Sequence, residues 1–218
     1  MKKSFPYVLG KILCGQYLMS KTKNIKTRFD GYLPVVIDIE TTGVDHQKNG
    51  LLELAVILLD YNDEGLLVTT KSDHWHITPF EGAVIDPEAL KITGIDPEHP
   101  FRFAIDEHKA LTELCNFVQT AVKQHACRRA VLVGHNAHFD LNFILSAIKR
   151  CKIKNNPFHA FTCLDTATLG GLAFKKTVLA KALKVAGIKF DKDAAHSALY
   201  DTEKTAELFC KIINEFDA

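Results

Sequence analysis

The segment Pro34-Val35-Val36-Ile37-Asp38-Ile39-Glu40-Thr41 decides both the fold and the candidate site of this chain. Its Val and Ile residues favour a buried β-strand. Alternate side chains of a strand share a face, so Asp38 and Glu40 lie side by side, roughly 6–7 Å apart. Burying two like charges is costly without compensation. The segment therefore predicts either a divalent cation held by carboxylate oxygens or a strand end where both carboxylates bond backbone amides.

Length and composition favour one α/β domain. The chain has 218 residues, of which 47% are hydrophobic and 24% charged, as in ordinary globular proteins. No window approaches the length of apolar sequence that a transmembrane helix needs, so we expect no membrane partner. The six cysteines form no C-x-x-C pair, which favours reduced thiols and a cytoplasmic protein over a disulfide framework or a zinc site.

Positive charge gathers near the N-terminus. Residues 1–30 contain seven Lys or Arg residues and one acid, although the whole chain has a net charge of only +1. A second basic cluster is Lys149-Arg150-Cys151-Lys152-Ile153-Lys154. Basic clusters favour a polyanionic partner, and the alternative is ordinary solubilising surface charge. We expect residues 1–28 to form a basic extension, partly disordered, ahead of a single domain at 29–218.

Hydrophobic periodicity predicts strands first and then alternating helices and strands. The expected strands are Pro34–Glu40, Leu51–Asp60, His74–Thr78, Ala130–Gly134 and Ala160–Leu164, the first two joined as a hairpin. The first expected helix begins at Pro87. The others span Leu111–Val122, Leu141–Ile148, Val178–Ala186 and Leu199–Phe216. This order predicts a mixed central sheet flanked by helices.

Two later segments supply further acids and a histidine. In Gly134-His135-Asn136-Ala137-His138-Phe139-Asp140, an expected strand is followed by a helix whose first turn carries Asp140. In Ala195-His196-Ser197-Ala198-Leu199-Tyr200-Asp201, His196 precedes the last helix and Asp201 lies on it. Taken singly, each residue has an ordinary alternative explanation. Asp140 would complement a helix dipole, His196 would be a loop histidine bonded to backbone, and Asp201 would be a solvated acid.

Taken together, the motifs D-x-E, H-N-x-x-F-D and H-x-x-x-x-D resemble the DEDDh exonuclease superfamily, whose fold is ribonuclease H-like. The segments PVVIDIETTG, LLELAVILL, PEALKITGIDP, GHNAHFD, NPFHAFTCLDTATL and AHSALYDTEKTAELF are similar to its ribonuclease T branch. The similarity extends from about Phe29 to Phe216. It implies a 3′→5′ exoribonuclease that trims unpaired 3′ ends of transfer RNA and other stable RNAs, with single-stranded DNA as a further substrate.

The resemblance also implies the catalytic groups. Two Mg²⁺ ions, with Mn²⁺ as an alternative, would lie about 3.5–4 Å apart and clamp the attacking and leaving oxygens. Asp38 would bridge both ions, Glu40 and Asp201 would bind the ion that activates water, and Asp140 would position the other. His196, in its neutral form, would take the proton of the attacking water.

Substrate-binding residues follow from the same resemblance. Relatives stack the last bases on phenylalanines and contact a base with a glutamate, which implies roles for Phe139, Phe161 and Glu88. Core packing is the alternative for both phenylalanines. Two further family phenylalanines are replaced by Val44 and Ile92, which puts the family's weak cleavage at a terminal cytosine in question.

The family acts as a homodimer in which a basic patch of one subunit holds the RNA stem for the partner's site. The residues at or near such patch positions are Arg28, Lys123, Arg129 and Lys154, for which ordinary surface charge is the alternative.

Two other functions are compatible with parts of the pattern. A proofreading subunit of a DNA polymerase shares the catalytic five, although Glu88 and the NPFHAF segment favour RNA processing. A non-catalytic nucleic-acid-binding module is opposed by the complete acid set. His74 and His76 alternate on a strand, but no third ligand accompanies them, so we expect them to be strand surface or edge residues.

Overall fold

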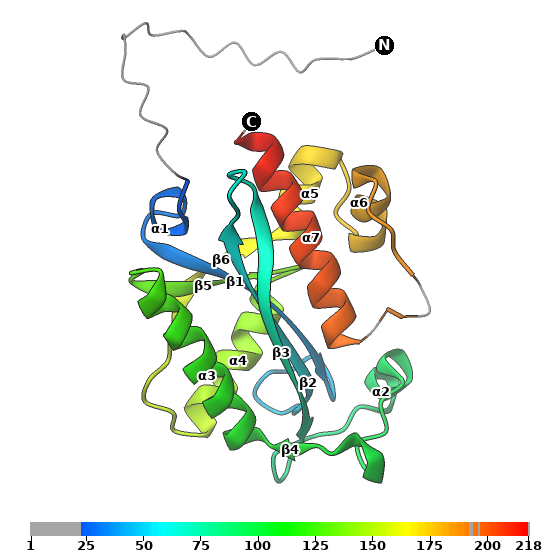
Figure 1. Cartoon of the computed structure of the whole chain (residues 1–218). Coiled ribbons are helices and arrows are strands. Elements are labelled where there is room, and N and C mark those ends of the chain that lie inside the picture. The colour runs from blue at the N-terminus through cyan, green and yellow to red at the C-terminus, as the bar shows by residue number, and fades with distance from the viewer. Residues whose placement is uncertain (1–22, 192–193, 196, 218) are drawn as a thin grey trace, which may run out of the picture.

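The computed structural model describes residues 23–191, 194–195 and 197–217 (Figure 1). A six-stranded sheet forms the centre, in the order β4-β3-β2-β1-β5-β6. Its strands are β1 (Tyr32–Thr41), β2 (Leu51–Tyr61), β3 (Leu67–Thr78), β4 (Ile105–Asp106), β5 (Arg129–Gly134) and β6 (Phe158–Asp165). The expected mixed sheet is confirmed, because β1 pairs antiparallel with β2 and parallel with β5.

Helices cover both faces of the sheet (Figure 1). They are α1 (Ile25–Arg28), α2 (Pro87–Thr93), α3 (Glu107–Gln124), α4 (His138–Arg150), α5 (Thr166–Phe174), α6 (Leu179–Ala186) and α7 (Ala198–Phe216), with a 3₁₀ turn, η1, at Pro100–Arg102. Helix α7 packs across β1, β2 and β3 and against α5 and α6, whereas α3 packs against α4. None of the described helices combines the length and apolar character needed to cross a bilayer.

The central strand β1 is buried because helices lie over both of its faces. Val35, Val36 and Ile37 are fully buried in the main core. Burying such a side chain stabilises the fold by about 1.5–3 kcal/mol. A smaller cluster joins Leu183 of α6 to Leu208 of α7. The strand that carries Asp38 and Glu40 is therefore held rigidly at the middle of the domain.

Several element boundaries differ from the sequence-based expectations. Strand β3 begins at Leu67 rather than His74, because polar residues on its outer face hide the strand pattern. Helix α5 and strand β4 were not expected. Helix α5 contains two glycines and has little amphipathic character, so periodicity does not reveal it. The helices predicted at Pro87 and at Val178–Ala186 are confirmed, the second beginning one residue later, at Leu179, and each ends at a glycine with positive φ, Gly94 and Gly187.

The structure describes only the last part of the expected basic extension. Residues 25–28, assigned from sequence to the basic extension, form helix α1, and Ile25 is buried in the main core. Residues 1–22 lie outside the described part of the chain, so the division at residue 28 remains a prediction. The five cysteines in the described part are free thiols.

Candidate active site

Three carboxylates from two distant parts of the chain meet at one end of the sheet. Asp38 and Glu40 project from β1, and Asp201 lies in the first turn of α7. Each offers an oxygen atom, and these atoms all lie within 4.8 Å of one another. Helix α7 brings Asp201 there because it packs directly on β1, β2 and β3.

Asp140 completes the acidic group from the other side of β1. Strand β5 runs parallel to β1 with Val36 opposite Val133, so both strands end at the same edge. Helix α4 starts four residues after β5, and Asp140 in its first turn is only 3% exposed. A Cβ on Gly134 would lie 3.1 Å from Ala137 Cα and 3.2 Å from Asp140 Oδ2, so a larger residue would require this turn to shift by a few tenths of an ångström.

Burial and mutual repulsion make these acids hard to ionise together. Desolvation is the largest cause and repulsion from the neighbouring carboxylates is the next; together they raise the pKa of Asp38 well above its ordinary value. The same causes raise the pKa of Glu40 to about 8. Burial raises the pKa of Asp140 to about 8, although backbone amides partly oppose it. A site of this kind is stable in its charged form only with cations bound.

The donor set suits hard divalent cations. All four side chains offer carboxylate oxygens, the ligands that Mg²⁺ and Mn²⁺ prefer, and no cysteine or histidine belongs to the group among the described residues. The repulsion that raises the pKa of Asp38 and Glu40 is what a bound cation would neutralise. The residues present therefore fit divalent metal binding.

The predicted general base His196 lies outside the described residues, so its role remains a prediction. Its neighbours are placed. Ser197 is the N-cap residue of α7, and the amide of Asp201 donates to the Ser197 carbonyl over 2.9 Å. The segment that carries His196 thus leads directly into the turn that carries Asp201.

Both predicted base-stacking side chains, Phe139 and Phe161, are accessible. Phe161 on β6 is 85% exposed, which excludes core packing for it. Phe139, next to Asp140, is 36% exposed and packs its other side on Phe143, with ring centroids 4.9 Å apart. Val44 and Ile92, where the resemblance implies phenylalanines in relatives, are 81% and 64% exposed. All four are apolar surfaces open to solvent.

Glu88 lies on α2, and hydrogen bonds tie the start of that helix to the end of β1. The amide of Asp86 donates to the Thr42 carbonyl over 2.8 Å, and Thr42 Oγ1 donates to the Val84 carbonyl over 2.7 Å. Glu88 is exposed and its carboxylate pairs with Lys91 at 2.5 Å. The loop therefore holds the start of α2 beside the end of β1 and leaves Glu88 exposed.

The four predicted phosphate-binding residues have different surroundings. Lys123 and Lys154 are exposed, and Arg129 is exposed with one guanidinium nitrogen donating to the Phe158 carbonyl over 3.1 Å. Arg28 instead forms a 2.9 Å ion pair with Asp217. Beside Arg28 and Arg129, a shallow hollow of about 540 Å³ is lined by Lys26, Thr27, Asp30, Gly31 and Arg128.

This basic surface lies far from the acidic group of the same subunit. Arg129 pairs with Tyr32 at the beginning of β1, whereas Asp38 and Glu40 lie near its end. At about 3.3 Å per residue, the eight steps from Tyr32 to Glu40 span roughly 26 Å. One subunit therefore does not place its basic surface and its acidic group side by side.

Sequence reasoning missed Glu53 and Asp165 near the site and gave His76 no role there. Glu53 on β2 lies opposite Glu40 in the strand pairing. His76 on β3 lies opposite Glu53, with Nδ1 3.1 Å from Glu53 Oε1, so it is not merely a surface residue. Asp165 ends β6, accepts hydrogen bonds from the amides of Asn136 and Ala167, and contributes to the raised pKa of Asp140. The LLEL segment was the only sequence signal for Glu53.

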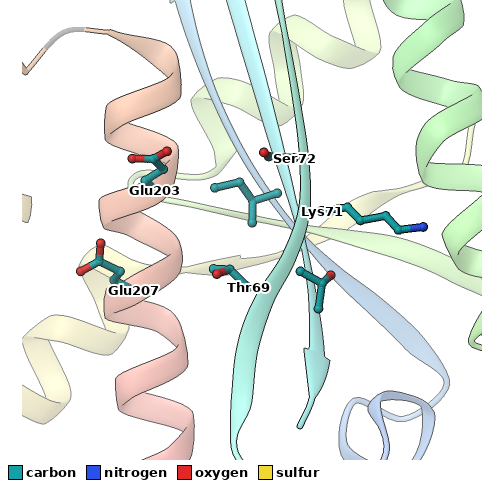
Figure 2. Close-up of a pocket in the computed structure, with 7 residues that line it drawn as sticks. Thr69, Lys71, Ser72, Glu203 and Glu207 are labelled. Carbon is teal, nitrogen blue, oxygen red and sulfur yellow. The ribbon is translucent and has the colours of Figure 1, made fainter.

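A separate hollow of about 220 Å³ lies between β3 and α7. Figure 2 shows Glu203 and Glu207 on the helix and Thr69 and Ser72 on the strand. Its lining contains none of the predicted site residues. It is therefore distinct from the acidic group and plays no part in the assignment of the site.

Comparison with known proteins agrees with this geometry. The family model RNase_T, described as an exonuclease, matches residues 35–209. The chain is 54% identical over 198 residues to ribonuclease T of Shewanella sp. strain ANA-3, which covers 91% of this chain and 89% of that protein. It is 55% identical over 192 residues to ribonuclease T of Shewanella oneidensis, covering 88% and 86% respectively.

Solved structures show the same fold. Escherichia coli exonuclease I, in complex with a dT13 oligonucleotide, matches with a TM-score of 0.64 at 16% identity, over 85% of this chain and 43% of that one. A 3′-exonuclease that recognises the histone mRNA stem-loop matches with a TM-score of 0.64 at 16% identity, over 84% and 83%. The expected ribonuclease H-like architecture is thus confirmed. With its complete set of motif acids and its close relatives, the chain belongs to the RNase_T family of exonucleases and is similar to ribonuclease T over most of its length.

Proposed function

We propose that this 3′→5′ exonuclease trims unpaired nucleotides from the 3′ ends of transfer RNA and other stable RNAs, in the cytoplasm, by two-metal phosphodiester hydrolysis. The observation that carries the proposal is the meeting of Asp38, Glu40 and Asp201 within 4.8 Å, with buried Asp140 beside them. Ribonuclease T relatives at about half identity supply the substrate class. Single-stranded DNA ends are a second substrate in the proposal.

The four carboxylates would hold two Mg²⁺ ions, with Mn²⁺ as a substitute. When bound, the ions supply positive charge that activates water and stabilises the leaving oxygen. Asp38, at the centre of β1, would contribute to both ions, Glu40 and Asp201 to one and Asp140 to the other. His196 would accept the proton of the attacking water, which requires its neutral form.

The exposed apolar residues would bind the 3′-terminal bases. Phe161 and Phe139 would stack on bases, and stacking of this kind contributes about 1–3 kcal/mol per base. Glu88 would contact a base edge from the start of α2. Val44 and Ile92 would give only part of an aromatic ring's stacking, so discrimination against a terminal cytosine would be weaker than with phenylalanine at these positions.

The distance between the basic surface and the acidic group favours a homodimer. Because roughly 26 Å separate Tyr32 from Glu40 along β1, a short 3′ overhang in one acidic group does not bring its stem onto the same subunit's Arg129. A partner subunit supplying Arg28, Lys123, Arg129 and Lys154 would hold the stem. Their phosphate contacts would position the RNA without reading its sequence.

A time course on stem-loops with 3′ overhangs tests the function. The RNA and DNA versions carry a 5′ label, end in C or A, and are incubated with Mg²⁺ or EDTA. We expect metal-dependent shortening that stops within a few nucleotides of the stem. Unshortened RNA in Mg²⁺ would refute the trimming function.

The same assay separates the two alternatives. A proofreading nuclease would digest only the DNA, continuing through the stem, and a binding module would retain RNA without turnover. The complete acidic group favours catalysis over simple binding.

A further inference from the structure

Glu53 is a carboxylate beside the acidic group whose contacts lead away from it. It lies on β2, opposite Glu40 of β1 and opposite His76 of β3. It is not one of the three described acids whose oxygens converge within 4.8 Å. Its charge nevertheless adds to the repulsion that raises the pKa of Asp38 and Glu40. The presence of a carboxylate at this position, where it adds repulsion, therefore needs an explanation other than metal binding.

One oxygen of Glu53 reaches the start of helix α7. Glu53 Oε2 accepts a hydrogen bond from the amide of Ala198 over 3.3 Å. Ala198 is the first residue of α7, and the side chain of the N-cap residue Ser197 makes no capping hydrogen bond. The first amides of a helix have no partner within the helix, and a negative charge near them is favourable. Glu53 thus supplies, from a distant strand, an acceptor for one of these unpartnered amides.

The other oxygen faces His76. Glu53 Oε1 lies 3.1 Å from His76 Nδ1, within ion-pair distance, and this nitrogen makes no hydrogen bond within the described part of the chain. The imidazole on β3 and the amide of Ala198 therefore approach Glu53 at its two oxygens. This arrangement restricts rotation of the carboxylate.

The turn that Glu53 holds is the turn that carries Asp201. The amide of Asp201 donates to the Ser197 carbonyl over 2.9 Å, so Ala198 and Asp201 belong to one hydrogen-bonded turn. A shift of Ala198 would move Asp201 relative to Asp38 and Glu40. Metal affinity depends steeply on this geometry, because groups that orient the ligands typically matter 10- to 100-fold.

We propose that Glu53 is a positioning residue that fixes the first turn of α7, and with it Asp201, against the strands that carry Asp38 and Glu40. His76 in turn fixes the Glu53 carboxylate. The proposal deepens the metal-dependent mechanism above and rests on it for its effect on catalysis. Its structural part, the anchoring of α7 by Glu53, stands independently.

Three variants and two readouts test it. Glu53→Ala removes both contacts, Glu53→Gln keeps a side-chain carbonyl that accepts from Ala198, and Glu113→Ala is the control. Glu113 lies on α3 and is also a carboxylate with one defined partner, because it accepts a hydrogen bond from Trp75 Nε1 over 2.8 Å. The readouts are Mn²⁺ binding by calorimetry and amide hydrogen exchange in the first two turns of α7.

We expect Glu53→Ala to weaken Mn²⁺ binding about 10- to 100-fold and to speed exchange at the start of α7. Glu53→Gln should restore most of both properties, and Glu113→Ala should change neither. Unchanged exchange in Glu53→Ala would overturn the proposal. Suppose that Glu53→Gln loses as much Mn²⁺ affinity as Glu53→Ala while its hydrogen exchange stays at the wild-type rate. That result would also overturn the proposal, because the negative charge of Glu53, rather than its anchoring of α7, would then determine Mn²⁺ binding.

Two further outcomes remain informative. If Glu53→Ala does not fold, Glu53→Asp gives the same comparison, because its carboxylate is one methylene too short to reach Ala198. If the wild-type protein binds Mn²⁺ but shortens no nucleic acid, the proposed function fails. The exchange measurement then still decides whether Glu53 anchors α7.

Discussion

Asp38 on the central strand and Asp201 on the last helix offer carboxylate oxygens within 4.8 Å of each other. Their closeness is unfavourable for the metal-free fold, since repulsion from Asp201 contributes to the raised pKa of Asp38. A structure that keeps them together gains from a cation that neutralises both. The first prediction tests this relationship directly.

Asp38→Asn should abolish cleavage while leaving the protein folded. A lost metal ligand removes several kcal/mol of transition-state stabilisation, about 10³-fold or more in rate. The amide has nearly the same shape and removes a repelling charge, so the thermal midpoint in EDTA should not fall. The checks are the overhang assay and thermal unfolding. Full activity in this variant would refute the site assignment.

The metal-free protein should lose stability as the pH rises. An acid whose pKa is raised by folding binds more protons in the folded state between its two pKa values, so the free energy of unfolding falls as pH rises across that interval. For Glu40 and Asp140 this interval runs from the ordinary pKa of each carboxyl group, in the unfolded chain, to a pKa of about 8 in the folded protein. In EDTA we expect the thermal midpoint to fall between about pH 5 and about pH 8.

Two controls isolate that effect. Saturating Mg²⁺ should remove most of the fall, because cations replace protons as the neutralising charge. The double variant Glu40→Gln/Asp140→Asn should flatten the profile in EDTA. A profile that is equally steep in the double variant would assign the pH dependence to other groups.

Phe161→Ala should weaken substrate binding without destabilising the fold. The ring is 85% exposed, so its removal leaves no cavity. Loss of one stacked base costs about 1–3 kcal/mol, or roughly 5- to 150-fold in KM for an RNA overhang. Phe216→Ala is the matched control, because Phe216 is also exposed but lies at the far end of α7. Equal effects of the two substitutions would contradict a specific stacking role.

Phenylalanines at positions 44 and 92 should sharpen base choice. Both native side chains are exposed, so Val44→Phe/Ile92→Phe enlarges them without core strain. The added stacking area should lower the rate at a terminal C relative to a terminal A, whereas the wild-type enzyme should discriminate less. Overhangs that differ only in the last base measure the ratio. An unchanged ratio would show that these positions do not contact the terminal bases.

Arg129→Ala and Arg28→Ala should have different consequences. Arg129 is exposed, so its loss should weaken RNA binding by a similar factor for all sequences. The slope of log affinity against log salt concentration should fall by about one, the contribution of one phosphate contact. Arg28 pairs with Asp217, whose carboxylate also accepts from Tyr61. Its loss should therefore lower the thermal midpoint as well. Binding measured against salt and thermal unfolding separate the two.

Mixed dimers test the proposed division of labour between subunits. Asp38→Asn and Arg129→Ala subunits are each impaired alone, but one arrangement in their mixture combines an intact acidic group with an intact basic surface. We expect the mixture to recover part of the activity. No recovery, with dimers demonstrated in solution, would contradict action across the dimer.

Local patterns were enough to predict the central strand, most of the later helices and the four acids that we propose as metal ligands. Asp38 and Glu40 alternate in a Val- and Ile-rich strand, and Asp140 and Asp201 sit in motifs at the start of periodic helices. These signals are short-range, because side-chain alternation and helical periodicity are written in neighbouring residues. The same reasoning failed at β4 and α5, where two residues of strand and a glycine-containing helix carry no periodic signal.

Only the tertiary structure decided which side chains support the site. Glu53 and His76 have ordinary sequence surroundings, and their importance comes from register across three strands and from the packing of α7 on that sheet. The ion pair between Arg28 and Asp217 is likewise a contact that only the fold shows. Such contacts join residues far apart in sequence, so no local pattern encodes them. They arise when the chain buries its apolar faces and so places polar groups side by side.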